Sequence, residues 1–105
     1  MKKVTPKVDE AGIIIGYVFH CPGCEHGHIF YTKSWATENG PTPKWDFNGD
    51  LEKPTFSPSL LNVCEKHHDP KQRRCHLCVT DGAIVFCNDC THDYASLTVV
   101  LPDRP

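Results

Sequence analysis

The side chains best able to do chemistry in this chain are seven cysteines and seven histidines among 105 residues. Cys21-Pro-Gly-Cys24 places two thiols at C-x-x-C spacing, and Pro-Gly favours a tight turn that brings both sulfurs to one side. A redox dithiol at this spacing needs a helix that begins at its second cysteine, and the polar segment Glu25–Ile29 predicts none. The motif therefore predicts a zinc knuckle, with Zn²⁺ as the cofactor.

A tetrahedral zinc site needs two further ligands, and the C-terminal part of the chain offers more than two. The candidates there are Cys75, His76, Cys78, Cys87, Cys90 and His92. In one arrangement, two C-x-x-C pairs that begin at Cys75 and Cys87 close a ribbon site by themselves. In the other, Cys75 and Cys90 complete the site of the N-terminal knuckle.

A predicted hairpin favours the second arrangement. Asp81-Gly82 lies between two alternating apolar runs, and this dipeptide tolerates the positive φ angles of a two-residue hairpin turn. The resulting register places Cys75 and Cys78 on opposite faces of one strand, so they cannot easily share an ion. The predicted metal ligands are Cys21, Cys24, Cys75, Cys90 and His92, with His28, His76 and Asp89 as further ligands or as their hydrogen-bond partners.

Short strands are expected to position these residues, because β-branched and aromatic residues alternate between turn signals. The fold class is mainly β: a small zinc-stabilised antiparallel domain with hairpins and at most one short helix. Pro54–Val63 is expected to be extended, with an edge strand in its first half at best, and Lys33–Lys44 is expected to be a loop. The predicted strands are Ile13–Phe19, Ile29–Thr32, Trp45–Phe47, Cys75–Thr80, Ala83–Cys87 and Ser96–Leu101.

Length and composition explain why such a fold needs metal. We expect residues 1–105 to form a single domain, and with 39% hydrophobic residues its core is thin. An odd number of cysteines cannot pair fully in disulfides. Met1–Lys7 is followed by no signal-type apolar segment, and Gly12–Phe19 is far shorter than the roughly 20 residues of a membrane span. We therefore expect a cytoplasmic protein of a bacterial host, with no membrane partner.

Several motifs, taken in order, carry a resemblance to a known family. They are Cys21-Pro-Gly-Cys24 with His28, Trp45-Asp-Phe-Asn-Gly-Asp50, Lys53-Pro-Thr-Phe-Ser-Pro-Ser59, Cys75-His76, Asp81-Gly82 and Asp89-Cys-Thr-His92. Over roughly residues 17 to 103, this order resembles a family of short phage and prophage proteins of unknown function, some labelled ammonia monooxygenase. The resemblance implies that the family's cysteine and histidine positions are Cys21, Cys24, His28, Cys75, His76, Cys90 and His92. Cys64, Cys78 and Cys87 depart from that pattern.

The favoured functional interpretation is a structural-zinc binding module of phage or prophage type that contacts a host or phage protein. A small metal-dependent hydrolase is the alternative, with His28, His76 and His92 around an open zinc and Asp89 as a base. A chain of this size offers little pocket wall, which favours the module over an enzyme. Ser57 and Ser59 stand beside prolines and are interpreted as turn-forming residues.

A nucleic-acid-binding zinc protein is the third interpretation. A basic segment could contact phosphates, and its fixed positive charges are Lys66, Lys71, Arg73 and Arg74. The formal net charge of the whole chain is −2, whereas nucleic-acid binders more often carry a basic excess. A protein partner is therefore favoured over nucleic acid.

Overall fold

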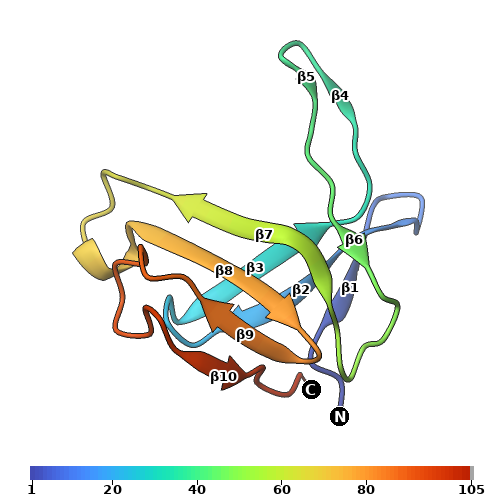
Figure 1. The fold of residues 1–105 in the computed structure, drawn as a ribbon. Coiled ribbons are helices and arrows are strands. Elements are labelled where there is room, and N and C mark those ends of the chain that lie inside the picture. Colours follow the sequence, from blue (N-terminus) through green and yellow to red (C-terminus); the bar gives the residue numbers. More distant parts are fainter. Residues whose placement is uncertain (105) are drawn as a thin grey trace.

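The computed structural model describes residues 1–104, which form two antiparallel β-sheets packed against each other and a projecting hairpin (Figure 1). The three-stranded sheet has the order β1-β2-β3, with β1 (Thr5–Val8), β2 (Ile14–Cys21) and β3 (His26–Tyr31). The five-stranded sheet has the order β10-β9-β8-β7-β6, with β6 (Asp46–Phe47), β7 (Phe56–Val63), β8 (Arg74–Thr80), β9 (Ala83–Phe86) and β10 (Thr98–Val100). The mainly antiparallel β fold predicted from the sequence is confirmed.

The core lies between the two sheets and is built by the alternation of each strand. On β8, for example, Cys75, Leu77 and Val79 point inward and are buried, while the residues between them face outward. Aromatic rings join the two layers, because Phe30 of β3 stacks on Phe56 of β7 with ring centroids 4.2 Å apart. The outer face of the five-stranded sheet is left open to solvent.

The hairpin of β8 and β9 has the predicted register. Asp81 and Gly82 take positive φ angles of 48° and 78°, as the two-residue turn requires. Val79 then pairs with Ile84, and Cys78 pairs with Val85. The side chain of Cys78 therefore faces outward, away from the buried Cys75.

The strand predicted within Pro54–Val63 was too short, because only the first half of this segment was expected to form one. β7 runs over Phe56–Val63 and pairs with β8 almost along its length, while β6 covers only the first two residues of its other edge. Ser57 and Ser59 therefore lie in a strand and not in a turn. The prolines are tolerated because the outer edge of β7 is mostly unpaired.

A bulge in β7 lies at these serines. Phe56 pairs with Val79, and the next paired residue of β7, Leu60, faces Leu77, so three residues of β7 lie opposite one of β8. Both Phe56 and Leu60 stay buried in the core. The bulge leaves Ser59 on the outer side of the sheet, above β8.

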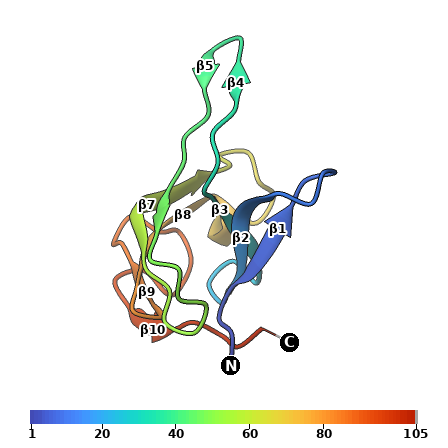
Figure 2. The ribbon, with the colours of Figure 1, turned by 90° about the vertical axis from the view of Figure 1, so that its right-hand side faces the viewer.

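Two short elements complete the fold. Lys33–Lys44 is not simply a loop, because β4 (Ala36–Thr37) and β5 (Gly40–Pro41) pair in a small hairpin that projects from the body (Figure 2). A 3₁₀ helix, η1 (Pro70–Gln72), precedes β8. No helix among residues 1–104 has the length and apolar character that crossing a membrane requires.

Candidate active site and metal centre

A serine, a histidine and an aspartate form a hydrogen-bonded row on the outer face of the five-stranded sheet. Ser59 Oγ on β7 lies 3.1 Å from Nε2 of His76 on β8. The other ring nitrogen, Nδ1, lies 3.2 Å from both carboxylate oxygens of Asp89, which follows β9. This is the connectivity of a catalytic triad: nucleophile to base, and base to an orienting carboxylate.

The carboxylate of this row is held in its charged form. Partial burial acts to raise the pKa of Asp89, but hydrogen bonds from Arg74 and His76 outweigh it and keep this pKa below its ordinary value. Arg74 Nε lies 3.0 Å from Oδ2. Because Asp89 accepts, His76 Nδ1 carries a proton, and Nε2 is left with the lone pair that can accept the proton of Ser59.

The backbone of His76 is fixed by a neighbouring cysteine. His76 N donates to Cys90 Sγ at 3.3 Å, and that thiol donates back to His76 O at 3.1 Å. Burial raises the pKa of Cys90, which favours the protonated thiol that this second bond needs. Cys90 thus ties the segment that carries Asp89 to the strand that carries His76.

A second cluster lies on the opposite, inner side of β8. The ligand atoms of Cys21, Cys24, His28 and Cys75 all lie within 4.8 Å of one another, and the sulfurs of Cys21 and Cys75 are 3.9 Å apart. Three sulfurs and one imidazole are a typical donor set for structural zinc. Cys90 and His92 adjoin this cluster, because their ligand atoms lie equally close to Cys75.

The thiols of this cluster cannot all ionise without a cation. Hydrogen bonds from Cys24 and Cys75 lower the pKa of Cys21. The contact between Cys21 and Cys24 raises the pKa of Cys24 to about 12. The bond to Cys21 also raises the pKa of Cys75. One sulfur therefore carries the charge while the others keep their protons, and a divalent cation is what would let all three act as thiolates.

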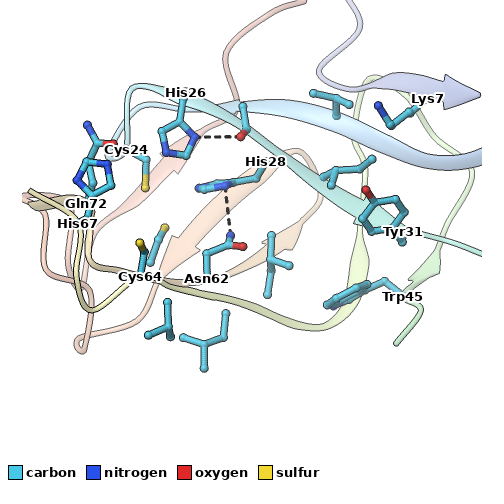
Figure 3. A pocket seen from close by; sticks show the side chains of 17 residues that line it. Lys7, Cys24, His26, His28, Tyr31, Trp45, Asn62, Cys64, His67 and Gln72 are labelled. Carbon is cyan, nitrogen blue, oxygen red and sulfur yellow. Dashed lines mark hydrogen bonds between the residues drawn. The ribbon is translucent and has the colours of Figure 1, made fainter. Parts of the chain in front are cut away.

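His28 has the geometry of a ligand. Its Nε2 is buried and has no hydrogen-bond partner, whereas its Nδ1 lies 3.2 Å from the side-chain amide of Asn62 (Figure 3). A metal on Nε2 requires a proton on Nδ1, which the amide oxygen of Asn62 can accept after a half-turn of the amide. An unpaired buried nitrogen beside three thiols fits a zinc site at this position.

His92 is held differently. Its Nδ1 accepts the backbone N–H of Tyr94 at 3.1 Å, so the neutral ring carries its proton on Nε2. That nitrogen lies 3.3 Å from Cys75 Sγ and can donate to it. Burial lowers the pKa of His92, which keeps the ring neutral. In this arrangement His92 supports the sulfur of Cys75, and the lone pair on its Nδ1 already accepts the backbone N–H of Tyr94.

A groove runs between the edges of β3 and β7. It has a volume of about 690 Å³, and Figure 3 shows Tyr31 and Trp45 towards one end and His28 with Asn62 farther along it. Trp45 Nε1 also donates to the carbonyl oxygen of Ser59 at 3.1 Å. The groove therefore leads along the strand that carries the serine.

The structure separates several residues that the sequence analysis grouped. His28 and His92 lie at the thiol cluster, whereas His76 is on the outer face with Asp89 and Cys87, so the three histidines do not surround one open zinc. In the basic segment, Lys71 pairs with Asp93, just as Arg74 pairs with Asp89. Half of the charge proposed for phosphate contact is thus compensated within the chain.

Ser59 is the functional candidate that sequence reasoning missed. No local motif marks it, because its partners are 17 and 30 residues further along the chain. The one available signal was a serine and a histidine on segments predicted to be extended, with an aspartate just beyond a third, and spacing alone does not show that they meet.

Comparison with known proteins identifies a family. A family model described as "Bacterial ubiquitination-like system serine protease (BubE)" matches residues 2–87, most of the chain. No curated protein and no solved structure matches this chain.

Proposed function

The chain belongs to the family of bacterial ubiquitination-like system serine proteases, and we propose that it is a serine hydrolase whose nucleophile is Ser59. The single observation that carries the proposal is the continuous hydrogen-bonded row from Ser59 through His76 to Asp89. It gives Ser59 the base and the orienting carboxylate that the nucleophile of a serine protease needs. This proposal replaces the binding module as the favoured interpretation.

The chemistry follows from the roles of the three side chains. Ser59 Oγ attacks the carbonyl carbon of the substrate while its proton passes to His76 Nε2. The C–N bond then breaks as His76 returns this proton to the leaving amine, and an acyl group stays on Ser59. Water, deprotonated by the same nitrogen, releases the acyl group and restores the serine. Asp89 stabilises the cationic ring in each step.

The substrate we propose is a protein of such a ubiquitination-like system, cut at a peptide or isopeptide bond. The sequence also favoured a protein over nucleic acid as the partner. The open outer edge of β7 and the adjoining groove suit an extended segment of polypeptide, because backbone groups on an unpaired edge can pair with it. Nucleic acid has less support, since Lys71 and Arg74 are already paired.

Zinc has a structural role in this proposal. We assign its ligands as Cys21, Cys24, His28 and Cys75, with His92 donating a hydrogen bond to Cys75. Four protein ligands make a closed site that stabilises the fold and leaves no position for substrate. The phage or prophage origin implied by the resemblance stays a prediction.

The proposal is tested with a library of fluorogenic peptide amides. Amides are chosen because stray thiols do not cleave them readily. The wild-type chain should cleave members of the library, and Ser59→Ala should lose this activity. Asp89→Asn should lower kcat by a factor on the order of 10³–10⁴, because the ring then takes the wrong tautomer.

Ser57→Ala is the matched control, since this serine lies in the same strand and forms no hydrogen bond with His76. It should keep wild-type kcat. Cleavage that survives in Ser59→Ala, or folded wild-type protein that cleaves no member, would contradict the proposal.

A further inference from the structure

Beside the hydrogen-bonded row, on the same outer face, lies a cysteine that the proposed reaction does not use. The ligand atoms of His76, Cys87 and Asp89 all lie within 4.8 Å of one another. Cys87 N donates to His76 O at 2.9 Å, which holds the two residues side by side across the end of the hairpin. All three side chains are partly exposed, so solutes can reach them.

We propose that His76, Cys87 and Asp89 form a second, inhibitory site for Zn²⁺. The donor set of one imidazole, one thiolate and one carboxylate suits zinc, and three protein ligands leave one position for water. Donors bonded to one zinc are separated by less than about 4 Å, so shifts of an ångström or less bring these atoms into place. Binding releases the thiol proton of Cys87 to solvent, and the ring proton of His76 passes from Nδ1 to Nε2.

The effect on catalysis follows from the tautomer of His76. Without zinc at this site, His76 Nδ1 donates to Asp89, which leaves the Nε2 lone pair to accept the proton of Ser59. With zinc on Nδ1, the neutral ring must carry its proton on Nε2, and it can no longer accept one from the serine. The cation also occupies the carboxylate that would stabilise the charged ring. The site therefore switches off the proposed hydrolase without any change of fold.

Two neighbours set the affinity of this site. Arg74 Nε already bonds Asp89 Oδ2 at 3.0 Å, and its positive charge opposes a second cation. Burial raises the pKa of Cys87 and so also opposes the thiolate that zinc needs. Cys78 acts in the other direction, because it lies on the same outer face and offers another sulfur. We expect binding that is weaker than at the four-ligand structural site and reversible by a mild chelator.

The site rests on the proposed function only for its inhibitory effect. Binding of the second ion can be measured whether or not Ser59 is a nucleophile, so the two ideas fail separately.

The test uses protein that carries one zinc per chain, titrated with ZnCl₂ in a calorimeter. The wild-type chain should bind a second, weaker equivalent, and Cys87→Ser should not. Cys64→Ser is the matched control, because Cys64 is an exposed thiol outside this group, and it should behave as wild type. A second equivalent that binds equally well to Cys87→Ser, or none in wild type, would overturn the site.

The same samples then report the inhibition through their rate of labelling by a fluorophosphonate. Added zinc should slow labelling of the wild-type chain by a factor on the order of 10², the contribution of a lost general base, and should leave Cys87→Ser unaffected. Zinc that binds without slowing the reaction would overturn the inhibitory role. An absence of labelling before zinc is added would count against the proposed function alone.

Discussion

The imidazoles of His28 and His92 illustrate how hydrogen bonding decides between a ligand and a supporting residue. Both rings are buried near Cys75, at 8% and 4% exposure. His92 Nδ1 is occupied by a backbone N–H, which cannot turn round, so its remaining nitrogen is a donor. His28 faces a side-chain amide, which can turn, so its remaining nitrogen is free to bind a cation.

This difference predicts unequal effects of two alanine variants on zinc affinity. His28→Ala should lower the affinity by more than about 100-fold, because a ligand is lost, and His92→Ala by about 10–100-fold, as for a partner that supports a ligand. Competition with a fluorescent zinc chelator measures both. If His92→Ala released the ion and His28→Ala kept it, the assignment of these two rings would have to be reversed.

How far these sites could be predicted depends on the separation of their residues in the sequence. Cys21 and Cys24 flank a two-residue turn, so their common orientation follows from local geometry. The meeting of Ser59 with His76 depends on which strands pair and on a bulge, so no local pattern contains it. The turn-forming interpretation of Ser59 failed for this reason.

At the scale of elements, the β8–β9 hairpin positions both clusters. Its register, predicted from Asp81-Gly82, sends Cys75 inward to the thiols and the next residue, His76, outward to Ser59. The alternation of one strand thus serves two sites on opposite faces. β1 and the β4–β5 hairpin were not predicted, because they carry no clear apolar alternation and pair through only a few residues.

The knuckle between β2 and β3 yields a prediction about close packing. A Cβ added at Gly23 would lie 2.5 Å from the ring of His92, which is itself confined by Phe86. Gly23→Ala should therefore destabilise the fold by about 1–3 kcal/mol, as overpacking does. Unfolding in urea measures the change.

Gly27→Ala provides the comparison from the adjoining strand. A Cβ there meets only ordinary contacts, the nearest at 3.5 Å from Val18. Its effect should stay within about 0.5 kcal/mol. Equal stability of the two variants would mean that His92 does not rest on the knuckle as described.

At the scale of the whole molecule, the proposed metal centre joins the two sheets. Cys21, Cys24 and His28 come from β2, β3 and their connection, whereas Cys75 comes from β8 in the other layer. A thin core leaves a small margin of stability, so a bond between layers contributes directly to folding. Because His76 follows Cys75, loss of zinc should disturb the hydrogen-bonded row of Ser59, His76 and Asp89 as well as the fold.

The central claim is that a zinc-held pair of sheets presents Ser59 as an activated nucleophile. Its most direct test is peptide-level mass spectrometry of the zinc-loaded chain after reaction with a fluorophosphonate, beside a sample first stripped of metal by a chelator. The account predicts one adduct per chain, located on Ser59, and its loss in the stripped sample together with the folded state. An adduct on another residue of the zinc-loaded chain, or no adduct on Ser59, would contradict it.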